Sequence, residues 1–177
     1  MSSIDLKVVL QRTVSRGYGD LVTRRTGQAV RFGVEEHLEA YGDGEVAIID
    51  FSGVRCLDFS CADEIVGKLL LTHGRVRYFL LRGVSEGQVV AIEQILERYE
   101  LAVVSEDRSG QMRVLGKISE PVRKTFHLVV ESGDAGVDDV VGHLDVTHDA
   151  ARETLEQLVQ LRLAMEGHAA NRVVSLA

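Results

Sequence analysis

The sequence of 177 residues has no tryptophan, one proline and two cysteines, and aromatic residues make up only 5% of it. Because large rings are scarce, the core must be aliphatic, and a hydrophobic content of 45% is enough for an ordinary globular interior. No run approaches the roughly 20 apolar residues of a membrane span. The N-terminus MSSIDLKVVLQR also lacks the apolar segment of a signal peptide. We therefore expect a cytoplasmic protein with no membrane contact.

Basic residues are fewer than acidic residues, 20 against 27, which gives a net charge of −7. Binding of nucleic acid through bulk electrostatics is disfavoured, although a local basic face is not ruled out by the total charge. The two cysteines, Cys56 and Cys61, form no CxxC motif and no zinc-type pair with histidine. We expect two buried free thiols in a reducing compartment, with no metal and no cofactor.

Apolar patterning alternates between strand and helix over the first two thirds of the chain. Strands are predicted at 6–10, 45–51, 77–82, 101–105 and 111–115. Helices are predicted from about 23 to 41, at 61–73, and at 85–99 with a capping box at its start. Loops are predicted at 16–20 and at 42–44, where glycines end the first helix. This alternation is typical of an α/β fold with a largely parallel sheet.

The alternation ends near Gly116, which divides the chain into an α/β domain at 1–116 and a small domain at 117–177. Pro121 marks a helix start, because proline is tolerated in the first helical turn. Helices are predicted at 120–131, at 137–143 and, after Thr147 as N-cap, to about residue 161. A loop is expected at 132–136, and two strands at 163–166 and 172–176 are expected to flank a turn at 167–171.

Two short motifs follow the strand at 45–51: Asp50-Phe-Ser-Gly-Val54 and Asp58-Phe-Ser-Cys61. The segment resembles the signature of STAS domains, in which Asp-Leu-Ser-Gly-Val precedes Asp-Ser-Ser-Gly or Asp-Ser-Thr-Gly at a helix start. Phe59 and Cys61 depart from the usual Ser and Gly, so the chain looks closer to an uncharacterised STAS-like group than to the anti-sigma-factor antagonists. The resemblance implies a mixed sheet with helices.

In that family, the protein binds a histidine-kinase-type ATPase that acts as an anti-sigma factor, and phosphorylation of the motif hydroxyl breaks the complex. Carried over by position, the phosphorylation candidate is Ser60, and the partner-binding residues are Asp58, Ser60, Asp63 and Glu64. We predict that Ser60 is an N-cap whose Oγ accepts the N–H of Asp63. Capping alone also explains Ser60 and Asp63, so a purely structural role is the alternative.

The C-terminal segment resembles the winged-helix modules of bacterial transcription regulators, with residues 147–161 as the recognition helix. His148, Arg152 and Arg172 are then candidates for DNA contact. From Lys117 onward, however, the chain has six basic and ten acidic residues, a net charge of −4. DNA-binding proteins orient themselves on the duplex by contacts from Arg and Lys to phosphates. An acidic C-terminal segment is poorly suited to this, so a packing or protein-contact role is favoured.

Other groups of residues give weaker indications of a metal, catalytic or binding site. His143, Asp145 and His148 lie close in sequence but are interpreted as solvated, and Asp50 and Asp58 as turn or capping residues. Neither GxSxG nor GxxxxGK is present. A basic cluster on the first predicted helix is interpreted as a solvated face, or as a contact for an acidic partner or a phosphate; it consists of Arg24, Arg25 and Arg31.

These observations predict a non-enzymatic regulatory protein that acts by protein–protein partner switching, controlled at Ser60. A DNA-binding transcription regulator is the alternative. A small-molecule enzyme that uses the end of the sheet is a third hypothesis, for which the sequence offers no catalytic constellation.

Overall fold

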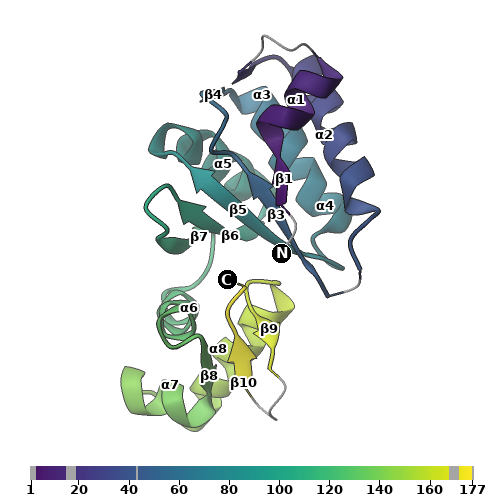
Figure 1. The fold of residues 1–177 in the computed structure, drawn as a ribbon. Coiled ribbons are helices and arrows are strands. Elements are labelled where there is room, and N and C mark those ends of the chain that lie inside the picture. Colours follow the sequence, from purple (N-terminus) through teal and green to yellow (C-terminus); the bar gives the residue numbers. More distant parts are fainter. Residues whose placement is uncertain (1–2, 15–18, 43, 168–171, 177) are drawn as a thin grey trace.

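The computed structural model describes residues 3–14, 19–42, 44–167 and 172–176. Its centre is a five-stranded mixed sheet in which four strands are parallel and the last is antiparallel (Figure 1). In sheet order the strands are β1 (Ser3–Asp5), β3 (Val46–Asp50), β5 (Tyr78–Val84), β6 (Ala102–Asp107) and β7 (Met112–Gly116). A separate parallel pair is formed by β2 (Asp20–Leu21) and β4 (Cys56–Leu57).

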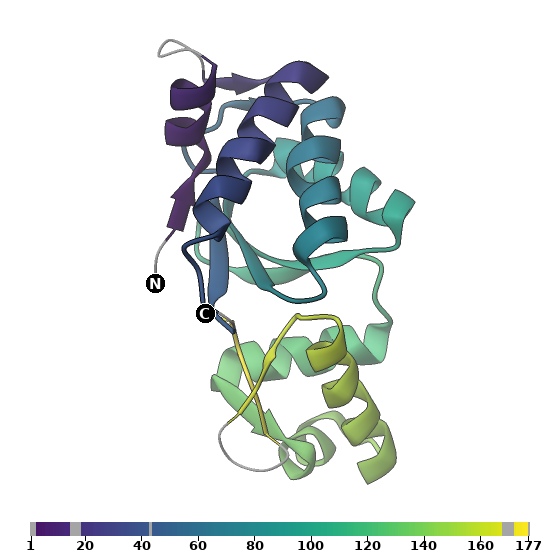
Figure 2. The ribbon, with the colours of Figure 1, turned by 90° about the vertical axis from the view of Figure 1, so that its right-hand side faces the viewer.

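The helices that connect these strands lie together on one face of the sheet (Figure 2). They are α1 (Leu6–Thr13), α2 (Arg24–Leu38), α3 (Phe59–Ala62), η1 (Asp63–Lys68), α4 (Leu69–His73) and α5 (Glu86–Tyr99). The segments α3, η1 and α4 follow one another without a break, and η1 is a stretch of π-helix. Within the described ranges, no helix is both long and apolar enough to cross a bilayer.

The strand predicted at 6–10 is wrong, because these residues begin α1. The Asp5 carboxylate caps this helix by accepting the N–H groups of Lys7 at 2.8 Å and Val8 at 3.2 Å. Leu6, Val9 and Leu10 are buried at helical spacing. The edge strand therefore consists only of the three residues that precede the helix.

The other predicted strands and helices of this part are confirmed to within a few residues. Thr23 caps α2, and the Ser85 N–H donates to Gln88 Oε1 at 2.8 Å at the start of α5. The predicted loops at 16–20 and 42–44 fall largely or partly on residues 15–18 and 43, which lie outside the described residues.

Strict alternation along the central strands sends successive side chains to two different hydrophobic cores. In β3, Ala47 and Ile49 face the helices named above, whereas Val46 and Ile48 face the other side. Strand β5 repeats the pattern. Both faces of the sheet are thus apolar and need a cover.

The C-terminal residues supply that cover. Their elements are α6 (Glu120–Ser132), β8 (Asp134–Gly136), α7 (Val137–Leu144), α8 (His148–Gln160), β9 (Met165–Glu166) and β10 (Arg172–Val174). One hydrophobic cluster joins Ile48 and Leu80 of the sheet to Phe126 of α6 and Leu158 of α8. The two parts of the chain, which differ in pattern, therefore share a core.

The three predicted C-terminal helices and the two strands are confirmed, but the loop predicted at 132–136 is partly wrong. Residues of β8 pair with β10, with Ala135 opposite Val173, and β10 pairs in turn with β9. The strand forms because both of these side chains are buried between the helices. Most of the predicted turn at 167–171 lies outside the described residues.

Gly67 lies where η1 packs against α5, so a substitution at this position tests how close the two helices are. A Cβ at this position would lie 2.6 Å from Ile95 Cγ2 and 2.9 Å from Tyr99 Cε2, distances that van der Waals packing forbids. We expect Gly67→Ala to lower the free energy of unfolding by about 1–3 kcal/mol through overpacking. Urea unfolding, monitored by circular dichroism, measures this change in the free energy of unfolding.

Gly87 in α5 is the matched control, because nothing lies within 4 Å of its added Cβ. Gly87→Ala should leave stability unchanged or slightly higher, since alanine favours helix. Equal stability of the two variants would contradict the close packing described.

Candidate functional site

Asp58 ties together the starts of two helices. It is the N-cap of α3: its Oδ1 accepts the N–H of Cys61 at 2.7 Å and the hydroxyl of Ser60 at 2.9 Å. Its Oδ2 accepts the N–H of Thr23, the N-cap of α2, at 2.9 Å. Thr23 has φ +78°, which is unfavourable for a β-branched residue. This hydrogen bond helps to hold the strained residue in place.

The prediction that Ser60 is the N-cap is wrong. Asp58 has the extended backbone of a cap, and Ser60 lies inside the first turn, where its hydroxyl donates to Asp58 instead of accepting from Asp63. The carboxylate takes the cap because a charged acceptor binds backbone N–H groups more strongly than a hydroxyl. Ser60 is half-buried, and the neighbouring Phe59 side chain is 43% exposed. The exposed Phe59 and the half-buried Ser60 are thus consecutive residues in the first turn of α3.

Asp63 and Glu64, two of the predicted partner-binding residues, lie in the interior, with 4% and 0% exposure. Arg24 Nη1 contacts both carboxylates, at 2.6 Å from Asp63 and 2.8 Å from Glu64. Glu64 is also paired with Lys68 and, at 3.3 Å, with Arg31 Nε. These carboxylates join α2 to η1 and are not placed to contact a partner directly.

Tyr99 of α5 and Glu35 of α2 complete this buried ion-pair cluster. The Tyr99 hydroxyl donates to Asp63 Oδ1 at 2.7 Å, and Glu35 pairs with Arg31 at 2.9 Å. Three cations thereby face three carboxylates. The balance matters because an uncompensated buried charge costs several kcal/mol.

The pKa values of Glu64, Asp63 and Asp58 are all lowered. Burial by itself would raise the pKa of Glu64, but hydrogen bonds from Lys68 and Arg24 outweigh it and lower the pKa. The pKa of Asp63 is likewise lowered, against the effect of burial, by Arg24 and Tyr99. Desolvation also opposes the lowered pKa of Asp58, which its hydrogen-bond donors produce. All three are therefore ionised at neutral pH.

The basic cluster expected on the first helix has a different role from a solvated face. Arg24 and Arg31 pair with the buried carboxylates, although Arg24 keeps 49% of its side chain exposed, and Arg25 is exposed as well. No local pattern reveals this, because the partners lie more than 30 residues away along the chain. The i,i+4 spacings of Glu64 with Lys68 and of Arg31 with Glu35 were the local sequence signals of the cluster.

One of the two predicted buried thiols is confirmed. Cys61 is buried and donates to the carbonyl of Thr23 at 3.0 Å, whereas Cys56 is exposed because the alternation of the short strand β4 turns it outward. Burial, together with the nearby Asp58 charge, raises the pKa of Cys61 to about 12. Cys61 is thus a packing residue rather than a nucleophile.

The three residues proposed for DNA contact all lie near carboxylates. Arg172 contacts Asp134 at 2.6 Å and Asp139 at 3.0 Å. Arg152 lies 3.6 Å from Asp149, and His148 lies 3.5 Å from Asp138. In the part of the chain that the structure describes, no group of three His, Cys, Asp or Glu side chains is placed to hold a metal ion.

The carboxyl edge of the sheet carries a polar row in which Asp50, Arg82 and Glu106 are in register. Arg82 Nε donates to Glu106 at 2.7 Å, and Asp50 accepts the N–H of Ser52 at 2.8 Å, the turn role expected for it. Strand order follows chain order, so the sheet has no reversal point of the kind at which α/β enzymes hold ligands.

No protein-family model matches the chain, and no curated protein matches it. The mixed sheet with helices is compatible with a STAS-like domain. Because one fold serves many functions, function is inferred from the site itself.

The buried ion-pair cluster predicts a sensitivity to acid. Since the folded-state pKa values of Asp63 and Glu64 lie below their ordinary values of 3.8 and 4.5, both groups stabilise the protein above pH 4.5. That contribution is lost as the pH falls through the lower folded-state values. At neutral pH, Glu64→Gln should lower the free energy of unfolding by about 1–3 kcal/mol, because it removes the buried charged acceptor of Arg31 and of the partly exposed Arg24 and Lys68.

Chemical denaturation between pH 7 and pH 3 tests this expectation, with Glu93→Gln, on the exposed side of α5, as the control. The difference between the wild type and Glu64→Gln should shrink toward pH 3. A constant difference over the whole range would show that the charge is not responsible.

Proposed function

We propose that the chain is a non-enzymatic binding module of a signalling pathway, which contacts a protein partner through Phe59 and Ser60 and releases it when Ser60 is phosphorylated. One observation carries the proposal: the Ser60 hydroxyl, which follows the exposed Phe59 in the chain, donates to Asp58, the residue that links the starts of α2 and α3. A change at this hydroxyl therefore reaches two helices.

Phosphorylation would act on this link in two ways. The phosphoryl group replaces the hydroxyl proton, so Ser60 can no longer donate to Asp58. It also adds a charge of about −1.5 to −2 close to the Asp58 carboxylate. The helix N-terminus favours such a charge, but Asp58 is repelled by it. Displacing Asp58 would free the Thr23 N–H and relax the strained start of α2.

The residues packed beneath Phe59 and Ser60 are held firmly in place, which supports a switch that is confined to the surface around these two residues. Cys61 fills the contact between α2 and α3, where a Cβ on Gly27 would lie 2.9 Å from Cys61 Cα. Asp63 and Glu64 are fixed by the buried ion-pair cluster. We infer that the change stays near Phe59 and Ser60 instead of unfolding the domain.

The partner class follows from the STAS resemblance: a histidine-kinase-type ATPase that serves as an anti-sigma factor. Phe59 stands where that family has a small polar residue. An exposed aromatic ring suits a protein interface, since aromatic side chains are enriched among residues that dominate binding energy.

DNA binding by the C-terminal residues is the second candidate, favoured by one observation. Helix α6, strand β8, helices α7 and α8, and the β9–β10 hairpin follow the element order of a winged helix. Two observations argue against DNA binding. Arg152 and Arg172 are paired with carboxylates, and part of the apolar surface of the C-terminal helices is buried against the central sheet. We therefore propose a packing role for these elements.

The partner surface can be tested by pull-down with identification by mass spectrometry. The wild type and Ser60→Ala should retain a histidine-kinase-type ATPase. Ser60→Asp should reduce the retained amount about tenfold or more through charge, and Phe59→Ala through lost apolar contact. Phe32→Ala is the matched control, because Phe32 is 56% exposed but lies on α2. If Ser60→Asp retains the partner as well as Phe32→Ala does, the switch is refuted.

A gel-shift titration at low salt tests the alternative. Because of the net charge of −4 from Lys117 onward, we expect no complex with duplex DNA at micromolar protein. Micromolar binding that weakens steeply with added salt, and that Arg172→Gln reduces, would favour the transcription regulator.

A further inference from the structure

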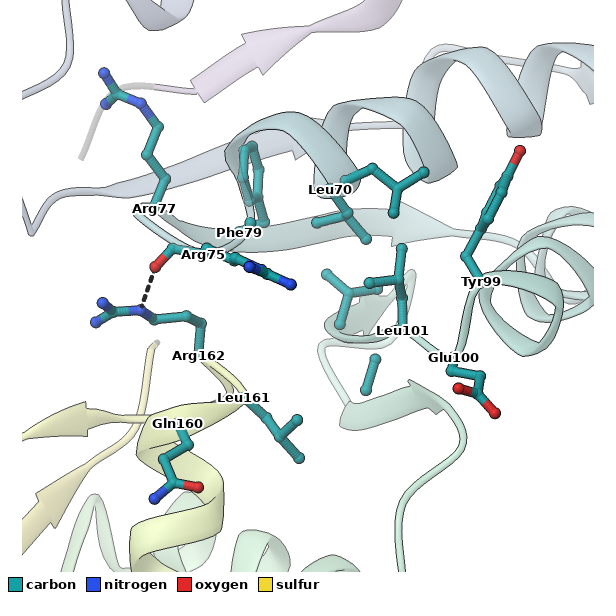
Figure 3. A pocket seen from close by; sticks show the side chains of 14 residues that line it. Leu70, Arg75, Arg77, Phe79, Tyr99, Glu100, Leu101, Gln160, Leu161 and Arg162 are labelled. Atoms are coloured by element: carbon teal, nitrogen blue, oxygen red, sulfur yellow. Dashed lines mark hydrogen bonds between the residues drawn. The ribbon is translucent and has the colours of Figure 1, made fainter.

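A cleft of about 530 Å³ lies between the amino-terminal ends of β5 and β6 and the end of α8 (Figure 3). This volume is within the range of small-molecule sites, about 300–1,000 Å³. The cleft shares no lining residue with the proposed partner surface at Phe59 and Ser60. Its lining comes from three places in the chain: 70–79 of α4 and β5, 99–103 at the start of β6, and 160–162 after α8.

The floor of the cleft is apolar. Leu70, Phe79 and Val103 are buried there, and Leu71 and Leu161 expose 49% and 44% of their surface at its sides. Exposed leucines on both sides of a concave surface favour a ligand with an apolar body, because its binding removes both from water.

The rim of the cleft is cationic. Arg75, Arg77 and Arg162 line it together with a single carboxylate, Glu100, which leaves an excess of two positive charges in a chain of net charge −7. In Figure 3, Arg75 extends into the cleft, while Arg77 and Arg162 lie toward one end and Glu100 toward the other.

The hydrogen-bond acceptors of Arg162 and Arg77 among the described residues carry no charge. Arg162 donates to the hydroxyl of Tyr78 at 2.8 Å and to the carbonyl of Arg75 at 3.2 Å, and Arg77 donates to the carbonyl of Tyr41 at 3.2 Å. These acceptors are uncharged. Among the described residues, none of the three arginines has an ion-pair partner, unlike Arg24, Arg31, Arg82 and Arg172.

The cleft is also preformed. Arg162 has φ +58°, an uncommon conformation for a residue with a side chain, and its guanidinium lies 4.9 Å over the Tyr78 ring. These contacts fix the end of α8 against the sheet. A ligand would therefore meet Arg162 already in position, which lowers the entropy cost of binding.

We propose that this cleft binds a small amphipathic anion, with its apolar body on Phe79 and Leu101 and its phosphate or carboxylate group at Arg75. The ligand would contact both the sheet and the residues after α8, and so would strengthen the junction between the two parts of the chain. This proposal does not depend on the role of Ser60.

Isothermal titration of the full chain with 1-naphthyl phosphate tests the site. We expect saturable binding of one equivalent, with 1-naphthol and inorganic phosphate each about tenfold or more weaker, because each lacks one of the two features. Arg75→Gln should weaken binding about tenfold or more by removing the charge, and Leu71→Gln should weaken it by removing apolar contact.

The matched control is Arg108→Gln, an exposed arginine in the turn between β6 and β7, which should bind as the wild type does. Thermal melts establish that all variants are folded, and neither Arg75 nor Leu71 is buried. The proposal is overturned if no probe binds up to about 1 mM, if inorganic phosphate binds as tightly as 1-naphthyl phosphate, or if Arg75→Gln and Arg108→Gln have the same affinity.

Discussion

The alternation of side chains along β3 and β5 constrains the whole molecule, because it makes both faces of the central sheet apolar. Ala47, Ile49 and Phe79 enter the core beneath the connecting helices, and Ile48 and Leu80 enter the core on the opposite side. Full burial of each Ile or Leu side chain contributes about 1.5–3 kcal/mol. An uncovered second face would forfeit this contribution, and the C-terminal helices provide the cover.

The layered core places polar chemistry at the periphery, where it links elements that the sheet does not connect. Asp58 joins α3 to the start of α2, and Arg24 joins α2 to the carboxylates of η1. The carboxylates tolerate burial because each has cationic or hydroxyl donors. The start of α3, which carries the half-buried Ser60, is therefore held by the buried ion-pair cluster beneath it, and this arrangement supports the proposed switch.

The cleft at the opposite end of the sheet arises from the same packing. Where the end of α8 meets the amino ends of β5 and β6, the two parts do not close completely, and three arginines border the remaining space. Their charge is not used in ion pairs among the described residues. The proposed partner surface and the cleft thus differ in chemistry: the first has a half-buried serine next to an exposed phenylalanine in the chain, and the second has an apolar floor with a cationic rim.

The sequence by itself determined the α/β class, the order of most elements, and the caps at Ser85 and Thr147, since these depend on side-chain period and on neighbours within one turn. It failed at residues 6–10, where apolar composition suggested a strand but the Asp5 cap began a helix. Only the tertiary structure decided that Asp58 rather than Ser60 caps α3, that Arg24 and Arg31 turn inward to Asp63 and Glu64, and that three arginines share a cleft. The physical reason is that burial and charge pairing are set by residues tens of positions apart, which approach one another only when the sheet and its helices have packed.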